Sequence, residues 1–200
     1  MIALVDYGIG NLRSVQKALE HVGANVALTE DPAVVLAAES VVLPGVGAFG
    51  DGMRGLVERG LDSAVRAVVA RGTPLLGICV GMQVLFETSE ERGEHPGLGL
   101  LPGRVRLFAA AGLKVPHTGW NEIEPVRDSP LLRGMPPGAH AYFNHSYYCD
   151  AAPADRLACA GYGLPFAAIV GRGRLYGIQF HPEKSQHIGL LLLRNFVEAG

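Results

Sequence analysis

Four short apolar segments, separated by stretches with helical spacing, constrain the fold of this chain more than any other feature. The segments are "IALV" at 2–5, "NVALT" at 25–29, "SVVLP" at 40–44 and "PLLGI" at 74–78. Between the first two, apolar residues from Leu12 to Val22 recur at the three- and four-residue spacing of one helix face. "PLLGI" has no polar alternation, as expected for a strand that is buried on both faces. This alternation predicts a parallel sheet with helices on both faces.

The second half of the chain has a different pattern, with several apolar segments separated by short turns. These are "RVRLF" at 104–108, "AYFNHSYY" at 141–148, "PFAAIV" at 165–170 and "RLYGIQF" at 174–180. Gly171 to Gly173 suits a hairpin between the last two, and a helix is expected over 185–199. No repeat or linker divides the sequence. We therefore expect a single α/β domain over 1–200, with three layers and a mixed, mostly parallel sheet.

Composition excludes several classes of function. The net charge is −2 with no run of like charges, which argues against nucleic acids and anionic membranes as partners. The first ten residues, "MIALVDYGIG", lack the basic and apolar regions of a signal peptide, and no segment is long enough to cross a bilayer. The cysteines Cys79, Cys149 and Cys159 are odd in number and have no metal-ligand spacing. We expect a cytoplasmic protein without a metal ion.

Cys79 stands between Gly77 and Gly81 in "GICVG", after an expected strand and before an expected helix that runs through Phe86. Glycine, nucleophile and glycine at this spacing describe a nucleophile elbow, a tight turn that lifts a reactive side chain clear of the sheet. The start of a helix also favours a thiolate over a thiol. We predict that Cys79 is a nucleophile. The alternative, a buried packing cysteine, is our interpretation of the other two cysteines.

A base for this nucleophile is predicted in "QFHPEKS" at 179–185, where His181 and Glu183 stand two apart at the end of a strand. Alternate residues of an extended chain point the same way, and the intervening proline favours extension. Glu183 could then orient the imidazole while its other nitrogen faces the thiol. Taken alone, the pair could also be a strand-end histidine beside a solvated glutamate. Its occurrence together with Cys79 favours a catalytic triad.

The glycine-rich segment "LPGVGAFG" at 43–50 offers backbone donors for an oxyanion. It follows the third strand, which adjoins the fourth if the strand order is sequential. Glycines allow N–H groups to turn toward a ligand. We expect one donor at Val46 or Gly47 and a second at the amide of Val80. The alternative is an ordinary surface loop.

In the order P-G-x-G, G-x-C-x-G-x-Q and H-P-E, these motifs resemble the class I, or triad, glutamine amidotransferases. The resemblance implies a flavodoxin-like mixed sheet flanked by helices, hydrolysis of the glutamine side-chain amide, and no cofactor. It implies that Cys79 forms a thioester, that His181 protonates ammonia and later activates water, and that Glu183 orients His181.

The same resemblance implies four substrate-binding residues. Gln83 matches a residue that binds L-glutamine, and Glu91 would hold its α-amino group, although a solvated charged loop is an alternative for Glu91. Ser146 and Tyr147 would offer backbone groups to its carboxylate. The histidines at 117, 140 and 145 are given no partner, and we expect them to be structural.

Five longer segments are similar to one branch of that family, the glutaminase subunits of imidazole glycerol phosphate synthases. They are "DYGIGNLRSV", "LPGVGAFGDGM", "KVPHTGWNEI", "YFNHSYY" and "FHPEKSQ". Asn144 departs from the pattern, because an apolar residue is expected before His145. The resemblance implies that ammonia passes to a cyclase subunit with a (βα)8 barrel in a heterodimer. The absence of a synthetase segment before the sequence stops at residue 200 leads to the same expectation.

The resemblance places the docking surface near Asn11, Trp120, Tyr142 and Lys184. Core packing is the alternative for Trp120, and a solvated strand end is the alternative for Lys184. Other functions remain open: an amidotransferase subunit for a different acceptor, a cysteine hydrolase or redox sensor on a related fold, and a non-catalytic regulatory subunit.

Overall fold

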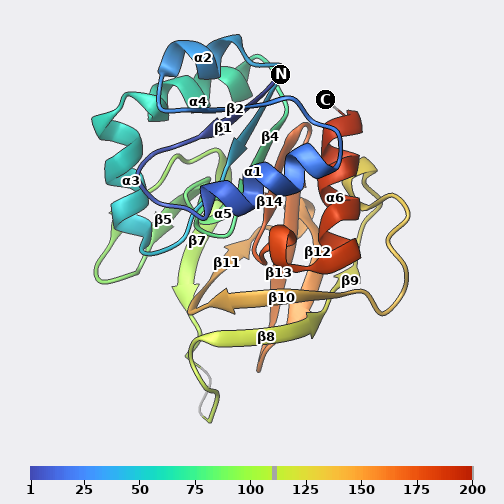
Figure 1. Ribbon diagram of the computed structural model, residues 1–200. Coiled ribbons are helices and arrows are strands. Elements are labelled where there is room, and N and C mark those ends of the chain that lie inside the picture. The colour runs from blue at the N-terminus through green and yellow to red at the C-terminus, as the bar shows by residue number, and fades with distance from the viewer. Residues whose placement is uncertain (110–111, 200) are drawn as a thin grey trace.

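The computed structural model describes residues 1–109 and 112–199 and is organised around an eight-stranded sheet (Figure 1). In spatial order the strands are β2 (Val26–Thr29), β1 (Ile2–Val5), β3 (Ser40–Leu43), β4 (Leu75–Ile78), β14 (Leu175–Ile178), β13 (Pro165–Arg172), β12 (Arg156–Gly161) and β9 (Glu124–Pro125). Strands β2 to β14 are parallel, and the remaining pairs are antiparallel. The expected mixed, mostly parallel sheet is confirmed.

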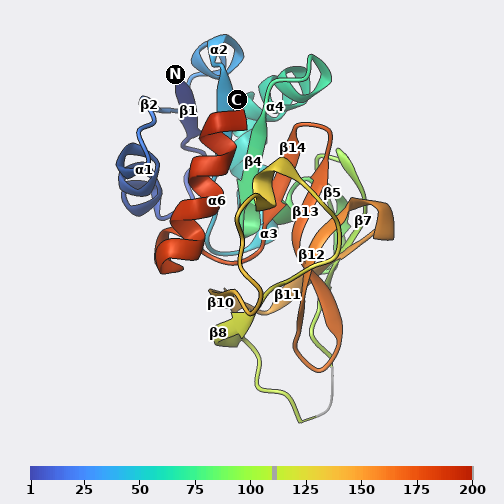
Figure 2. The ribbon, with the colours of Figure 1, turned by 90° about the vertical axis from the view of Figure 1, so that its right-hand side faces the viewer.

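Helices cover both faces of this sheet, as the alternating sequence pattern predicts. They are α1 (Leu12–His21), α2 (Pro32–Ala37), α3 (Phe49–Glu58), α4 (Leu61–Ala70), α5 (Val80–Gln83) and α6 (Gln186–Ala199), with short 3-10 helices η1 (Pro130–Leu132), η2 (Pro153–Asp155) and η3 (Pro182–Lys184). In Figure 2, α1 and α6 lie together on one side of the strands, and α4 lies on the other. All residues of β1, β3, β4 and β14 are buried, so the apolar runs lie at the centre of the molecule.

Two smaller sheets lie beside the carboxyl ends of the parallel strands. One contains β11 (Tyr147–Ala151), β7 (Leu101–Leu107), β5 (Phe86–Ser89) and β6 (His95–Pro96), and the other pairs β10 (His140–His145) with β8 (His117–Glu122). The expectation of one strand over 141–148 is wrong. Strand β10 ends at His145, and after Ser146 the chain continues as β11 in a different sheet. Figure 1 shows β8 and β10 crossing below the main sheet.

Two expectations for the first half are also corrected. The glycine-rich segment at 43–50 is not a loop throughout, since α3 already begins at Phe49. The helix after Cys79 stops at Gln83 instead of reaching Phe86. Phe86 begins β5 and pairs with Leu101 of β7, so strand pairing replaces the last helical turn.

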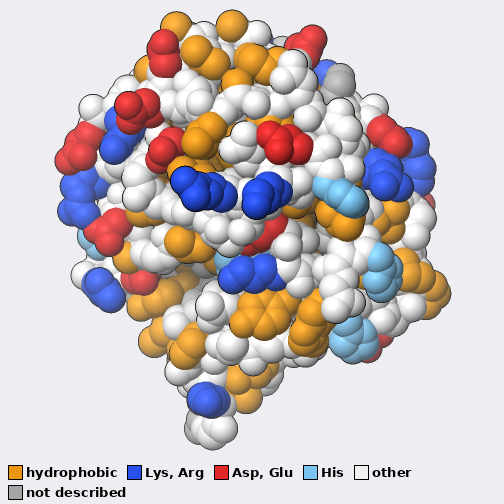
Figure 3. Space-filling view, in the orientation of Figure 1, with side chains coloured by type: hydrophobic (Ala, Val, Ile, Leu, Met, Phe, Trp, Pro, Cys, Tyr) orange, Lys and Arg blue, Asp and Glu red, His pale blue; other side chains and the backbone are white. Residues whose placement is uncertain are grey.

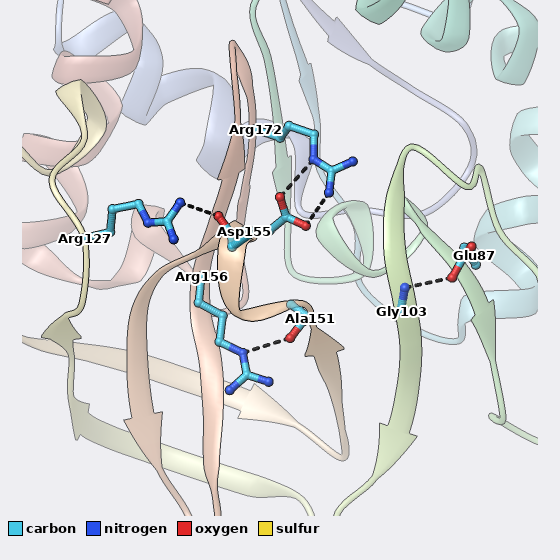
Figure 4. A network of polar contacts seen from close by, with 8 residues as sticks. Glu87, Gly103, Arg127, Ala151, Asp155, Arg156 and Arg172 are labelled. Atoms are coloured by element: carbon cyan, nitrogen blue, oxygen red, sulfur yellow. Dashed lines mark hydrogen bonds and ion pairs between the residues drawn. The ribbon is translucent and has the colours of Figure 1, made fainter.

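A polar network fixes the antiparallel edge of the main sheet (Figure 4). The side chain of Asp155, only 4% exposed, accepts hydrogen bonds of 2.9 and 2.8 Å from Nε and Nη2 of Arg172. Arg156 Nε donates to the carbonyl of Ala151 at 2.8 Å. Paired, planar contacts of this kind are among the stronger ionic hydrogen bonds in proteins. These contacts join η2 to the end of β13 and the start of β12 to the end of β11, and none of these residues lines the cavity described below.

Candidate active site

Cys79 occupies a sharp turn between β4 and α5, with φ of +54° and ψ of −111°. Its amide donates to the carbonyl of Ile178 at 2.7 Å. A Cβ atom at Gly77 would lie 2.4 Å from the Gly81 carbonyl oxygen, and one at Gly81 would lie 1.7 Å from that of Leu43. Both neighbours are backbone atoms, so these two positions have no room for a side chain. The strained conformation and the glycine flanks are those of a nucleophile elbow.

His181 and Glu183 lie behind the elbow as a buried pair. Nδ1 of His181 is 3.0 Å from Oε1 of Glu183, and the two side chains are 5% and 1% exposed. The expected extended conformation is wrong, because Pro182–Lys184 forms η3. The Ser185 hydroxyl donates to the carbonyl of His181 at 2.7 Å and closes this turn. The carboxylate therefore reaches the ring across a helical turn.

The surroundings of His181 favour its charged form. Burial alone would lower its pKa, but hydrogen bonds to Cys79 and Glu183, together with their negative charges, raise the pKa to about 9. This raised pKa favours the imidazolium form of His181 at neutral pH. Oε2 of Glu183 is buried and has no hydrogen-bond partner among the described residues.

A small cavity of about 120 Å³ opens in front of the sulfur. Its lining residues are Val46, Gly47, Cys79, Val80, Gln83, Glu91, Asn144, His145, Ser146, Tyr147 and His181. The structure thus gathers the predicted nucleophile, the predicted base, and all predicted oxyanion and substrate residues around one space. Glu183 lies outside it, in contact with His181.

Hydrogen bonds from Tyr7 and to Glu91 hold the loop that carries the predicted oxyanion donors. The buried Tyr7 hydroxyl donates to the carbonyl of Pro44, and burial raises the Tyr7 pKa, so it remains a donor. Gly47 has φ of +103°, a conformation that favours glycine. Glu91 accepts a hydrogen bond of 2.7 Å from the amide of Phe49 at the start of α3. One carboxylate oxygen of Glu91 is therefore occupied by the protein.

Two buried glutamines, Gln83 and Gln179, form a chain of contacts from the Tyr147 carbonyl to the sulfur of Cys79. Nε2 of Gln83 donates to the Tyr147 carbonyl at 3.2 Å and to Oε1 of Gln179 at 3.3 Å. Nε2 of Gln179 lies 3.9 Å from Sγ of Cys79, within reach of a weak N–H···S hydrogen bond. Sequence reasoning missed Gln179. A signal existed, because it is an uncharged polar residue in the apolar run "LYGIQF", and it is fully buried.

The histidines at 117 and 145, which we expected to be structural and for which we named no partner, are paired with each other. Nδ1 of His117 is 3.0 Å from Nε2 of His145, and both rings are buried at the back of the cavity. The third, His140, is exposed. Asn144, which departs from the expected apolar residue type, is exposed and lines the cavity, and its side-chain oxygen accepts a hydrogen bond from the hydroxyl of Thr118 at 3.1 Å.

The residues predicted for docking lie outside the cavity. Trp120 and Tyr142 are cross-strand neighbours on β8 and β10 with ring centroids 6.2 Å apart, and Nζ of Lys184 is 5.8 Å from the Tyr142 centroid. Trp120 is 49% exposed, which rules out core packing, and Lys184 is exposed at the end of η3. Asn11 is half-buried just before α1. Figure 3 shows basic side chains beside hydrophobic ones on this face, over α1 and β10.

The other two cysteines, Cys149 and Cys159, do not line the cavity. Burial raises the pKa of the Cys149 thiol well above its usual value, while Cys159 is half-buried; neither is disulfide-bonded. Across residues 1–109 and 112–199, no three His, Cys, Asp or Glu side chains are arranged to hold a metal ion. None of the described helices has the length and apolar character needed to cross a membrane.

Comparison with known families agrees with this geometry. The family model described as "Glutamine amidotransferase class-I" matches residues 3–199. The chain belongs to this family. Among its relatives in the family, the imidazole glycerol phosphate synthase subunit HisH of Moorella thermoacetica is 53% identical, with 98% of this chain and 94% of the relative covered. The subunit of the same name from Methanosarcina mazei is 51% identical, with 98% of both chains covered.

Solved structures of other amidotransferases share the fold. A crystal structure of a glutamine amidotransferase aligns with a TM-score of 0.78 at 22% identity, over 99% of this chain and 98% of the other. The structure of PurLQS from Thermotoga maritima aligns with a TM-score of 0.74 at 17% identity, over 99% and 97%. At these identities the likeness concerns the fold, which agrees with the three-layer mixed-sheet architecture.

Proposed function

We propose that this chain is the glutaminase subunit of an imidazole glycerol phosphate synthase, and that it acts in the cytoplasm in histidine biosynthesis. The observation that carries the proposal is that Cys79 and His181 line one cavity, while the buried carboxylate of Glu183 holds the His181 ring from outside it. The relatives at 51–53% identity with that subunit name support the choice of acceptor over other amidotransferases.

The reaction follows from the positions of these three groups. With imidazolium beside it, the sulfur of Cys79 is favoured as thiolate and attacks the side-chain amide carbon of L-glutamine. His181 donates its proton to the departing nitrogen, the C–N bond breaks, and ammonia leaves a thioester on Cys79. His181 then takes a proton from water, which attacks the thioester and releases glutamate. Glu183 orients the imidazole throughout.

Backbone N–H groups would stabilise the negative charge on the tetrahedral oxygen. The amide of Val80 stands in the first turn of α5, where N–H groups have no partner within the helix. Val46 and Gly47 face the same cavity from the opposite loop. Because α5 has only four residues, these individual amides matter more than a helix dipole. We assign the oxyanion hole to Val80 with Val46 or Gly47.

The α-ammonium and the α-carboxylate of glutamine need different hydrogen-bond partners. An α-ammonium needs acceptors, and Gln83 uses its amide nitrogen on protein partners, which leaves its oxygen for substrate. The unoccupied oxygen of Glu91 is a second acceptor. An α-carboxylate needs donors, and the carbonyls of Ser146 and Tyr147 already accept protein hydrogen bonds. The donors that we propose for the carboxylate are backbone N–H groups of this segment.

The ammonia would pass to a cyclase subunit with a (βα)8 barrel, in a heterodimer. Ammonia released into water at neutral pH is protonated and no longer nucleophilic, so direct transfer is needed. We place the docking surface at Trp120, Tyr142 and Lys184, with Asn11 at its edge, because an exposed aromatic pair beside a cation suits an interface. The cyclase would convert a phosphoribulosyl imidazole-carboxamide to imidazole glycerol phosphate and an aminoimidazole-carboxamide ribotide.

Ammonia release from glutamine, measured with this chain alone and mixed with a cyclase and its ribulosyl ligand, tests the proposal. We expect activity that rises with the liganded cyclase. Cys79→Ala should abolish glutamine turnover, while its complex still forms product from added ammonium. Glutamine turnover without any effect of the cyclase would instead indicate an amidotransferase subunit for another acceptor. No glutamine turnover in the presence of the cyclase would refute the proposal.

A further inference from the structure

His117 and His145 form a directly hydrogen-bonded pair of imidazoles at the back of the cavity. They are opposite residues of the antiparallel strands β8 and β10, with Nδ1 of His117 3.0 Å from Nε2 of His145. Both are about 95% buried, at 4% and 5% exposure. Phe108, Phe143 and Phe166 are within 6.3 Å of both rings, measured between centroids. A polar pair in such an apolar site must satisfy its own hydrogen bonds.

The partners of the two rings determine where their protons lie. Nδ1 of His145 is 2.8 Å from the carbonyl oxygen of Tyr147, which can only accept, so this nitrogen carries the proton. In a neutral ring Nε2 of His145 is then an acceptor, and it receives the Nδ1–H of His117. The remaining nitrogen of His117 lies 3.3 Å from the amide nitrogen of Asn121, which donates to it.

The orientation of Asn121 is fixed independently of the histidines. Its side-chain oxygen accepts from the amide of Glu122 at 2.9 Å, and its nitrogen also donates to the carbonyl of Gly161 at 2.8 Å. The hydrogen bonds therefore run in one direction, from Asn121 through His117 and His145 to Tyr147. Both imidazoles are neutral and protonated at Nδ1.

The electrostatic surroundings also favour the neutral pair. Burial lowers the pKa of His145 to about 3, and the charge of nearby His181 adds to this. Burial also lowers the pKa of His117. A second proton on His145 would place two N–H groups against each other at 3.0 Å. The only cationic imidazole at the cavity is then His181 among the residues that line it.

The carbonyl of Tyr147 connects this pair to the substrate pocket. It accepts from His145 at 2.8 Å and from Gln83 at 3.2 Å, which uses both of its lone pairs. Gln83 continues to Gln179, and Gln179 reaches the sulfur of Cys79. The orientation of the Gln83 amide thus depends on a carbonyl that the histidines hold from the other side.

We propose that His117 and His145 are positioning residues, a neutral pair fixed in the Nδ1–H tautomer that holds the Tyr147 carbonyl and, through it, Gln83 against the substrate. The role in catalysis rests on the proposed glutaminase function, in which Gln83 binds glutamine. The tautomer and the hydrogen-bond direction do not depend on that function.

Nitrogen NMR of the two imidazoles tests the pair in the wild-type chain without reference to activity. We expect both rings to be neutral at pH 7, each with its proton on Nδ1, and the ring signals to be assigned by loss in His117→Asn and His145→Asn. A proton on Nε2 of either ring, or an imidazolium signal from either, overturns the proposal. This result is decisive even if glutamine turnover is never detected, so the two proposals fail separately.

Kinetics test the positioning role. His145→Leu removes the donor to the Tyr147 carbonyl, and we expect the KM for glutamine to rise about tenfold, the effect of one lost hydrogen bond. The kcat should change less than threefold, because the triad is untouched. His145→Asn, whose amide nitrogen stands near the position of Nδ1, should restore most of the KM.

His140→Leu is the matched control, since His140 is exposed on the same strand, and it should leave KM unchanged. A fall in kcat as large as the rise in KM in His145→Leu would indicate a purely structural role and overturn the proposal. An unrestored KM in His145→Asn would do the same. If His145→Leu does not fold, the same comparison between His117→Asn and His117→Leu decides the question.

Discussion

The two sides of the cavity are built on different physical principles. On the elbow side, formed by the ends of β3 and β4 and the start of α5, the backbone approaches itself so closely that Gly77 and Gly81 have no room for a Cβ atom. On the histidine side, formed by β8, β10 and β11, buried side chains hold the backbone through hydrogen bonds. The elbow side therefore requires residues without a side chain, whereas the histidine side requires hydrogen-bond donors and acceptors at fixed positions.

This difference teaches that the two sides should respond differently to substitution. A steric requirement is absolute, because a carbonyl oxygen cannot move aside without disturbing the sheet. A hydrogen-bonding requirement is met by any side chain that places the right atom in the right position. The elbow side should therefore lose its fold on a single added methyl group, whereas the histidine side should tolerate isosteres and outward-facing changes.

The largest effect is expected from Gly81→Ala. Its methyl group would lie 1.7 Å from the carbonyl oxygen of Leu43, and we expect loss of native structure or destabilisation by about 3 kcal/mol or more. Urea unfolding measures the change. Gly161→Ala is the control, because no atom lies within 4 Å of that Cβ position, and its effect should be within about 0.5 kcal/mol. Similar unfolding free energies for both variants would refute the steric account.

Glu183→Gln tests the buried carboxylate that hydrogen-bonds His181 from outside the cavity. Together with Cys79, the Glu183 carboxylate raises the His181 pKa to about 9, and the variant removes this acceptor and its charge, so the pKa should fall. We expect glutamine hydrolysis to fall about 10³-fold, within the range of general acid–base catalysis. The control is Glu58→Gln, an exposed carboxylate at the end of α3, which should change neither quantity.

The same variant has a defined pH dependence. Because the folded pKa of His181 is raised above its ordinary value of 6.5, its charged form stabilises the fold fully below pH 6.5, and this contribution is lost as the pH rises through about 9. The difference in unfolding free energy between wild type and Glu183→Gln should therefore be larger at pH 6 than at pH 9.5. A difference that does not change with pH would contradict the ion pair.

Trp120→Ala examines the outward face of β8, the strand that carries His117 on its inward face. Under the proposed function, we expect the Kd for the cyclase to rise about 30-fold, as for an aromatic hot spot, with the imidazole tautomers unchanged. Titration calorimetry measures the affinity. Val126→Ala, which truncates another exposed apolar side chain, should leave Kd unaltered. An unchanged Kd in Trp120→Ala would exclude this surface as the docking site.

The smallest effect is expected from Asn144→Val, because this exposed residue next to His145 lines the cavity but has its side chain hydrogen-bonded to Thr118. It loses one exposed hydrogen bond with Thr118, so the unfolding free energy should change by about 0.5 kcal/mol or less. The KM for glutamine should stay within about twofold of wild type, a change worth under 0.5 kcal/mol. A tenfold change would show that the histidine side is as intolerant as the elbow.

The sequence alone predicted the elbow side well, because its requirement is contained in the five residues Gly77 to Gly81. The buried parallel strands were also predictable from continuous apolar runs. The histidine side was not, because His117 and His145 are 28 residues apart and meet only through the register of β8 and β10. Strand β8 reads "HTGWNE", which carries little apolar alternation. Pairing with β10 determines that this segment is a strand more than its own residues do.

The local conformation of "HPE" was wrong for a related reason. Proline permits both an extended chain and the first turn of a helix, and the hydroxyl of Ser185 closes the turn. The predicted contact between His181 and Glu183 nevertheless exists, since spacing by two residues can bring side chains together in either conformation.

The left-handed backbone at Cys79 sets chemistry against thermodynamics at one position. A non-glycine residue held at φ of +54° adopts a conformation that disfavours folding by about 1–3 kcal/mol, and glycine would adopt it freely. Stability alone would therefore favour glycine at position 79, and the sulfur is held in this turn at a cost in folding free energy.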